Sequence, residues 1–479
     1  MSLILNKKEI NIRIQNKKIN FTKDKLTTIL KKTFNNSIKI IKFINFGDDK
    51  NTNSNIICNN KHEKHVNPLL WQFGHVIFFY INLILKNLPD FSYSTYNKFN
   101  KYIDFYDSHK TPLINRNGDL LIEYDECFEL YIKLMNDLED YINLKKITNI
   151  ETYLIMLGLL HNEMHNEAFI FTNLYQSNLI NIKLTHLDIY KYEISKDEIS
   201  KDEISKDEIS KDEHNNHLIK NIEFIDYNGG TFIQGHNYNT EYLVFDNESP
   251  QFEKKIDNFK INKYPITEYQ YLLFIKSNGY IDNKYWSRNG YLWKERNNIS
   301  LPLYWVIINN NYFKKINNTL YSVNTNLPIT NISYYEAEAY CNWKGVRLPN
   351  ESEFEFISTN EGKTKFPWGN QSIDDHKCNL NYNKYIVEVN KYEDGDNYKK
   401  VSQLLGNVWE WCQEPIYPYD GFEIDPVYRE MSYPFFGYKK ICRGGCFAVP
   451  DYLIHTKYRN AQYPDCRIQF IGFRVCSKN

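Results

Sequence analysis

The chain has 479 residues, a length typical of roughly two to four domains. Lys and Arg number 58 and Asp and Glu number 59, so the formal net charge is -1. This balance argues against a protein that mainly binds nucleic acid, because phosphate neutralisation needs clustered positive charge. The 42% of hydrophobic residues, with 16% aromatics, is enough to build sizeable cores and excludes wholesale disorder.

Membrane insertion and export are not expected. No apolar run is expected to approach the roughly 20 residues of a membrane span. The first eight residues place an apolar patch before their charges, the reverse of a secretory signal. The nine cysteines are odd in number and include no Cys-x-x-Cys pair, which disfavours a disulfide framework. We therefore expect a cytoplasmic protein with reduced thiols, no nucleic-acid or membrane partner and no obligate protein partner.

The first part of the chain has the apolar spacing of helices. Hydrophobic residues recur at i, i+3 and i+4, which predicts helices over residues 68–85, 125–144 and 150–174, with a weaker one over 23–34. Four helices favour a bundle, with residues 90–118 as a long loop over one end. We assign residues 1–190 to this helical domain.

A repeat divides the chain. From Glu193 to Asp212 the unit Glu-Ile-Ser-Lys-Asp occurs four times without change. Its isoleucines recur every five residues, about 140° apart on a helix, so they make no continuous apolar stripe. We interpret residues 191–217 as a solvated linker and predict that deleting the repeat leaves stability and metal content unchanged.

After the linker the pattern of hydrophobic and turn-forming residues changes. Short apolar stretches alternate with Gly, Asn and Pro, and helices are predicted at 333–343, where Ser333 and Glu336 form a capping box, and at 350–356. Residues 218–479 are therefore expected to form an α+β domain of low regular-structure content. The predicted fold class is α followed by α+β.

Three histidines have the spacing of a metal site. His161 and His165 lie four residues apart, which places both on one face of the predicted helix. His75 lies in a predicted helix among aromatic residues, where a polar side chain needs a partner. Imidazole suits iron, copper or zinc, although a His-x-x-x-His pair alone is more often coincidental. Glu167 lies about 200° round the helix from His165 and is expected to orient the helix or bond the other domain.

Eight motifs in the second half occur in the same order as in a known protein family. They are GGTFIQG (229–235), PITEYQY (265–271), PITNISYYEAEAYCNW (328–343), RLPNESEFEF (347–356), FPWGN (366–370), GNVWEW (406–411), RGGCF (443–447) and GFRV (472–475). Together they resemble the formylglycine-generating-enzyme, or sulfatase-modifying-factor, fold, which is C-type-lectin-like. The copper-binding cysteine pair of those enzymes is absent from residues 452–458, which disfavours sulfatase activation. Cys446 replaces the usual Ser of Arg-Gly-Gly-Ser and is expected to be a small buried residue.

The first half also resembles a known domain. NPLLWQFGHVIFFY (67–80) and HNEMHNEAF (161–169) look like the DinB-like four-helix bundle of ergothioneine-type sulfoxide synthases. That resemblance implies Fe(II) bound by His75, His161 and His165, an active-site tyrosine at Tyr428, and O2 as co-substrate. It further implies a thiol or selenol donor and a histidine derivative as acceptor, with a C–S or C–Se bond and a sulfoxide as product.

Substrate residues depart from the bacterial pattern. The resemblance places Asn460, Gln462, Arg467 and Arg116 near the substrates, and the stretch from Asp107 to Arg116 is closer to the selenoneine-synthase branch. It also implies a calcium site formed by Gln403, Gly406, Val408 and Glu410, for which a structural hydrogen-bonding role of Glu410 is the alternative. Two other functions stay open: a non-catalytic module of the same fold, with or without a metal, and a protein-modifying oxidase.

Overall fold

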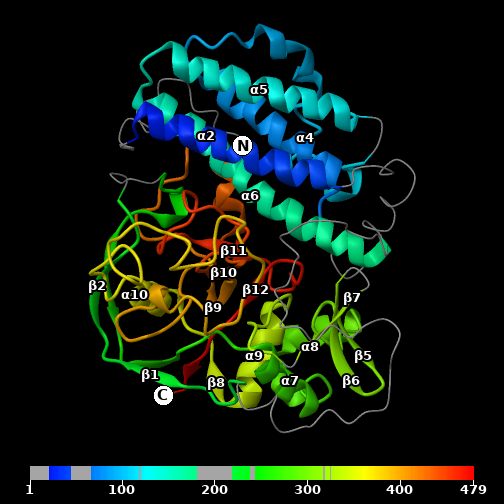
Figure 1. Ribbon diagram of the computed structural model, residues 1–479, viewed down its shortest axis with the longest axis vertical. Coiled ribbons are helices and arrows are strands. Elements are labelled where there is room, and N and C mark those ends of the chain that lie inside the picture. Colours follow the sequence, from blue (N-terminus) through cyan, green and yellow to red (C-terminus); the bar gives the residue numbers. More distant parts are fainter. Residues whose placement is uncertain are drawn as a thin grey trace.

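The computed structural model describes residues 21–44, 66–117, 120–180, 218–237, 243–316, 319–323 and 325–478. Figure 1 shows helices gathered in the upper part of the molecule and an irregular part with short strands below them. Helix α6 lies at the boundary between the two parts. The repeat from Glu193 to Asp212 lies outside the described residues.

The four predicted helices are all present and pack against one another, so the prediction of a helical bundle is confirmed. They are α2 (Lys23–Phe43), α4 (Leu69–Phe79), α5 (Tyr124–Leu144) and α6 (Asn149–Ile180). Helix α2 extends well past its predicted end, and Thr22 caps it by accepting a hydrogen bond from the backbone N–H of Lys25 at 3.2 Å.

Helix α4 continues into a π-helix, Tyr80–Ile84, and a 3-10 turn, Leu85–Asn87. The stretch Leu69–Asn87 is long and apolar enough to cross a membrane by length and composition, so the expectation that no such run exists was wrong. However, 78% of its most apolar window is buried inside the protein, as in the core helix of a bundle. Close packing explains the burial: a Cβ on Gly158 of α6 would lie 2.5 Å from the Tyr80 ring.

The predicted loop between α4 and α5 contains two 3-10 helices, Tyr93–Tyr102 and Leu113–Asn115. It returns across α4, where Trp71 Nε1 donates a hydrogen bond to the carbonyl oxygen of Phe105 at 3.0 Å. The rings of Phe78 and Tyr106 stack with centroids 4.7 Å apart. The loop is thus fixed against the helix that carries His75.

The second part has little regular structure, as predicted. Its described strands form a sheet of order β1-β4-β13-β8, a sheet of order β11-β10-β9-β12, the hairpin β2-β3 and the three-stranded sheet β5-β6-β7. The bounds are β1 (Phe224–Tyr227), β2 (Gly230–Gln234), β3 (Phe252–Ile256), β4 (Phe259–Asn262), β5 (Trp305–Ile308), β6 (Asn311–Ile316), β7 (Thr319–Ser322), β8 (Val346–Arg347), β9 (Trp409–Pro415), β10 (Lys440–Arg443), β11 (Asn460–Gln462), β12 (Ile471–Gly472) and β13 (Cys476–Ser477).

Short helices flank these sheets. They are α7 (Glu268–Lys276), α8 (Arg288–Arg296), α9 (Tyr334–Lys344) and α10 (Glu351–Ser358), with 3-10 turns at Asp246–Glu248, Asn283–Tyr285, Glu393–Gly395, Arg429–Met431 and Tyr433–Phe435. The predicted capping box is confirmed: Ser333 Oγ accepts from the N–H of Glu336, and the Glu336 carboxylate accepts from the N–H of Ser333 at 2.7 Å. Helices α7 and α8 were not expected from the sequence pattern.

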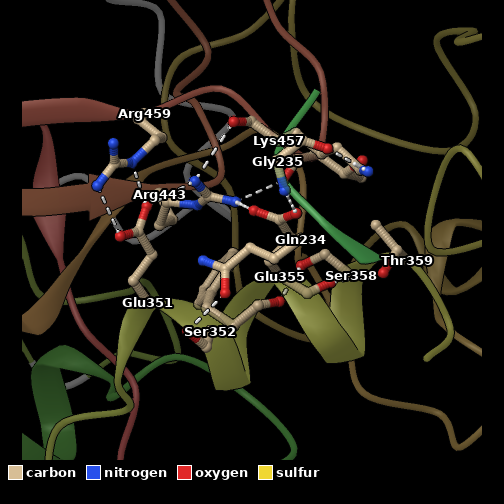
Figure 2. A network of polar contacts seen from close by, with 12 residues as sticks. Gln234, Gly235, Glu351, Ser352, Glu355, Ser358, Thr359, Arg443, Lys457 and Arg459 are labelled. Atoms are coloured by element: carbon tan, nitrogen blue, oxygen red, sulfur yellow. Dashed lines mark hydrogen bonds and ion pairs between the residues drawn. The ribbon is translucent and has the colours of Figure 1, made fainter. Parts of the chain in front are cut away.

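A buried ion network fixes strand β10 against helix α10 (Figure 2). Arg443 donates to Glu355 at 2.7 Å and to Glu351 at 3.1 Å, and Arg459 donates to both oxygens of Glu351. All four side chains are buried. Removing one charge from such a network leaves its partner buried and unpaired, at a cost of about 3–5 kcal/mol. The network therefore fixes Arg459 and, next to it, the start of β11.

Two carboxylates of α6 join the bundle to the second part. Glu163 accepts hydrogen bonds from the hydroxyls of Tyr382, at 2.6 Å, and Tyr452. Glu167 accepts from Trp409 Nε1 at 2.8 Å. The expectation that Glu167 bonds the other domain is confirmed, and burial raises its pKa to about 7.

Candidate metal centre

The structure brings His75, His161 and His165 together. One potential ligand nitrogen from each ring lies within 4.8 Å of the other two. The ring centroids are 5.2 Å apart for His75 and His161, 4.9 Å for His75 and His165, and 4.6 Å for His161 and His165. Within the described ranges this is the only group of three or more His, Cys, Asp or Glu side chains with such convergence.

The orientation of His75 is fixed by the loop that crosses α4. Its Nδ1 lies 2.7 Å from the carbonyl oxygen of Tyr106. A carbonyl accepts only, so Nδ1 carries the proton and Nε2 keeps its lone pair for a metal. Trp71 stacks on the same ring at a centroid distance of 5.2 Å. The partner that a buried histidine needs is therefore a backbone carbonyl, which sequence patterns do not reveal.

The two histidines of α6 have ring nitrogens that are free to bind a cation. Both ring nitrogens of His161 and Nδ1 of His165 are buried and have no hydrogen-bond partner among the described residues. Leaving such groups unpaired costs about 1–3 kcal/mol each, which metal binding would offset. Burial lowers the pKa of His75 to about 4 and the pKa values of His161 and His165 well below the ordinary value. All three rings are thus neutral, as metal binding requires, and the residues present fit a metal.

Aromatic rings from both parts of the molecule border the site. Phe79 stacks on His161 with ring centroids 3.6 Å apart. Tyr428, from the segment between β9 and β10, meets the His161 ring edge-on at 5.6 Å and the Phe79 ring at 5.0 Å. Its phenol is half-buried. The structure thus places the predicted tyrosine beside the histidines, although it lies 263 residues beyond His165 in the chain.

Arg116 is a charged side chain next to the cluster. Its guanidinium stacks on Trp71 at 4.2 Å from the ring centroid and donates to the carbonyl oxygens of Thr111 and Ser108 at 3.0 and 2.8 Å. Its charge lowers the pKa values of His75 and His165, after the larger effect of burial. An anionic substrate group near the histidines would therefore meet a favourable potential.

Two other predicted substrate residues lie on the strand β11. Asn460 pairs with Cys442 of β10. Figure 1 shows β11 below α6 in the view. The side-chain oxygen of Asn460 accepts from the N–H of Ala461 at 2.8 Å and from Gln462 Nε2 at 3.4 Å. Both side chains are half-buried.

The fourth predicted substrate residue, Arg467, is paired with residues of the second part. It forms a buried ion pair with Glu336 at 3.1 Å and donates to the carbonyl oxygen of Leu301. These partners belong to α9 and the loop before β5, so the structure does not bring this guanidinium to the histidines. We accordingly give Arg467 a structural role in place of the predicted substrate contact.

The calcium site expected at Gln403, Gly406, Val408 and Glu410 is corrected. Both oxygens of Glu410 accept from Arg474 at 2.7 Å, and both side chains are fully buried. The Gln403 amide bonds the carbonyl oxygen of Glu388 and the amide of Asn407 at 2.8 Å each. Arg474 thus takes both carboxylate oxygens of Glu410, which supports the alternative of a structural acceptor for this residue.

Cys446 is fully buried, as expected, and its Sγ lies 3.2 Å from the carboxylate of Glu167. Burial, and then that carboxylate, raise the pKa of the thiol well above its ordinary value. A thiol with such a pKa stays protonated and unreactive. The eight cysteines of the described residues are all free.

The fold and the site together define a two-part protein in which a helical bundle supplies a three-histidine cluster and an irregular α+β domain covers it. A family model described as the sulfatase-modifying factor enzyme 1-like domain matches residues 209–479, more than half of the chain. The chain belongs to this family. The match begins within the repeat and so starts before the predicted boundary at residue 218.

Curated relatives match the same part of the chain. A hercynine oxygenase from Mycobacterium tuberculosis is 31% identical over 250 residues, covering 51% of this chain and 58% of the relative. A second, from Mycolicibacterium smegmatis, is 30% identical over 257 residues, covering 52% and 59%. A formylglycine-generating enzyme from Thermomonospora curvata is 26% identical over 291 residues, covering 52% and 91%. The chain thus spans less than two thirds of the length of the hercynine oxygenases it matches.

Proposed function

We propose that the protein is a nonheme Fe(II)- and O2-dependent oxidoreductase that joins a thiol or selenol to the imidazole ring of a histidine derivative. The C–S or C–Se bond would form on the imidazole carbon and the product would be a sulfoxide. The observation that carries the proposal is the three-histidine cluster with unpartnered nitrogens, bordered by the phenol of Tyr428. The relatives named hercynine oxygenase favour a histidine derivative, such as trimethylhistidine, as the acceptor.

His75, His161 and His165 would hold the metal through neutral nitrogens, with the carbonyl of Tyr106 fixing the tautomer of His75. When bound, Fe(II) would supply open coordination positions for a thiolate and O2 and the redox chemistry of C–S bond formation. Tyr428 would donate a proton or hydrogen atom from its hydroxyl at the edge of the cluster. Arg116 would attract a carboxylate, and Asn460 and Gln462 would hold the acceptor from β11.

The arrangement has a physical rationale. Phe79 and the buried helices exclude water from one side of the histidines, while half-buried Tyr428 meets His161 from the other part. Sites between domains are a preferred location for ligand pockets. A bundle that supplies the metal and a second domain that supplies the substrate contacts would place the two substrates within near-attack reach of one another. A cytoplasmic location belongs to the same proposal.

A non-catalytic module of the same fold is the second candidate, because the chain matches less than two thirds of the length of the hercynine oxygenases. A protein-modifying oxidase is disfavoured, because the eight described cysteines are buried and free, and burial would protect them from a peptide substrate. The two candidates differ from the proposal in a measurable way: neither predicts a small-molecule sulfoxide.

The test begins with the full chain reconstituted with Fe(II) under anaerobic conditions. Trimethylhistidine or histidine and a panel of thiols and selenols are added, air is admitted, and O2 uptake and products are followed by electrode and mass spectrometry. The proposal expects O2 uptake that needs both substrates, and a product whose mass equals acceptor plus donor plus one oxygen atom minus two hydrogen atoms, the second oxygen atom leaving as water. Stoichiometric iron without any product would favour the non-catalytic module.

A further inference from the structure

Tyr428 lies in a segment without strands, between β9 and β10, yet its ring is held against His161 and Phe79. We propose that Asp425 is a positioning residue that fixes Tyr428 on the three-histidine cluster by linking the turn that carries it to helix α6. The inference rests on the proposed function, in which the phenol of Tyr428 acts at the metal centre. It concerns a residue outside the motifs that carry the family resemblance.

One oxygen of Asp425 sets the local turn. Oδ1 accepts hydrogen bonds from the backbone N–H groups of Val427 and Tyr428, both at 2.9 Å. An aspartate that bonds its own backbone two and three residues on fixes the chain in a turn that the sequence would not otherwise impose. The backbone of Tyr428 has φ -111° and ψ 67°, and its N–H is one of the two donors to this carboxylate.

The other oxygen of Asp425 faces the bundle. Oδ2 accepts from the hydroxyl of Tyr153, a residue of α6 eight positions before His161. Eight residues are just over two helical turns, so Tyr153 and the ligand lie on one rigid rod about 12 Å apart. The carboxylate, which is 4% exposed, therefore connects the tyrosine-bearing turn to the helix that carries two of the three histidines.

A second buried carboxylate holds the rest of the segment. Asp246 accepts from the N–H of Asp425 at 3.2 Å and from Ser432 Oγ at 2.6 Å. These two bonds bracket residues 425–432 on both sides of Tyr428. The segment is thus fixed to its own domain by Asp246 and tied directly to helix α6 by Asp425.

Positioning of this kind matters for chemistry. A misplacement of about 1 Å in a reacting group can lower the rate about a hundredfold, whereas the affinity for substrate need not change. We therefore expect Tyr153→Phe and Asp425→Asn to lower kcat about ten- to a hundredfold, with the KM values and the bound iron close to those of the parent. The first variant removes only the link to α6, and the second weakens it while keeping the turn.

The deciding readout does not need activity. Fluorotyrosine is inserted at position 428 in the full-length apoprotein, and its fluorine NMR resonance is recorded. In the parent, the rings of Phe79 and His161 should shift this resonance from that of the free amino acid, and Phe79→Leu should move it, which assigns the contact. Tyr153→Phe and Asp425→Ala should shift the resonance toward the free value and broaden it.

Glu268→Gln is the matched control, because Glu268 is a buried acid of the same domain that pairs with Lys314 at 3.1 Å and with Thr325, far along the chain from Tyr428. It should lower stability and leave the resonance in place. A parent-like resonance in Tyr153→Phe would overturn the proposal, as would an equal shift in the control. If Asp425→Ala does not fold, Tyr153→Phe decides the matter alone. A loaded enzyme with no activity would refute the proposed function, while the resonance would still decide the positioning role.

Discussion

The ring of Tyr106 covers Gly74 while the carbonyl of the same residue holds Nδ1 of the adjacent His75 at 2.7 Å. A Cβ added at Gly74 would lie 2.1 Å from Cε1 of Tyr106. One residue of the loop therefore sets both how closely the loop approaches α4 and how the first histidine of the cluster is oriented.

Gly74→Ala tests this relationship. The clash should displace Tyr106 and cost about 1–3 kcal/mol of unfolding free energy, as overpacking does. Loss of the carbonyl partner of His75 should also weaken metal binding about 10–100-fold. Thermal melts and iron or cobalt titrations measure the two effects. Gly230→Ala, whose Cβ would meet nothing closer than 3.8 Å, is the control, and an unaltered metal affinity in Gly74→Ala would contradict the assignment.

His161→Ala and His165→Ala should each abolish stoichiometric iron binding while the apoprotein stays folded. Both nitrogens of His161 and Nδ1 of His165 are buried and have no hydrogen-bond partner within the described structure, so removing either ring costs no hydrogen bond from these atoms. Metal analysis after anaerobic reconstitution and far-UV circular dichroism check the two parts of the expectation. His109→Ala, at an exposed position, should behave as the parent. Near-stoichiometric iron in either cluster variant would show that the histidines are not the ligands.

The sulfur or selenium donor should not be γ-glutamylcysteine but a smaller or less anionic compound. Two carboxylates in a partly desolvated site need guanidinium forks. Arg467 is bound to Glu336, which leaves Arg116 as the arginine next to the cluster. The comparison is kcat/KM for γ-glutamylcysteine, cysteine, glutathione and a thio- or selenosugar. A tenfold preference for γ-glutamylcysteine, about 1.4 kcal/mol, would refute the expectation.

Arg116→Ala should raise the KM for an anionic donor by about tenfold with less effect on kcat. The reason is that a hydrogen bond between the guanidinium and a substrate carboxylate contributes at most about 1.5–3 kcal/mol to binding. Arg116→Lys should recover only part of the loss, because an ammonium cannot stack on Trp71 as the guanidinium does. Equal KM values for anionic and neutral donors in the parent and in Arg116→Ala would remove this residue from the substrate site.

Glu248 should make the protein less stable as the pH rises. Burial raises the pKa of this carboxyl from 4.5 to about 8 in the folded chain. The folded state therefore binds more protons than the unfolded state between these values, so stability falls as pH rises through this window. Glu248→Gln removes this dependence of stability on pH. The melting temperature of the variant minus that of the parent should therefore rise from about pH 4.5 to about pH 8 and stay constant above that. A constant difference across that window would refute the shift.

The parts that sequence patterns predicted well are those set by local spacing. The helices α4, α5 and α6 follow from apolar periodicity, and the capping box at Ser333 from the chemistry of helix starts. His161 and His165 share a face because they are four residues apart on one helix. These features depend on neighbours in the chain, which a sequence displays directly.

The parts that could not be predicted depend on contacts distant in sequence. The partner of His75 is a carbonyl oxygen, which every residue possesses and no pattern marks. Glu410 and Arg467 looked available for ligands until the structure showed Arg474 and Glu336 beside them. The role of Asp425 depends on Tyr153, 272 residues away. A sequence shows which charged residues are present, whereas only the fold shows which of them are already paired with one another.

The order of the cluster along the chain has a consequence for its biosynthesis. His75, His161 and His165 all lie in the first 165 residues, whereas Tyr428 is made much later. At about 5–20 residues per second, about 13–53 s separate the last histidine from the tyrosine on the ribosome. A nascent chain would therefore present the three imidazoles well before the phenol of Tyr428. Cells that make this protein would gain from delaying metal delivery until translation is complete.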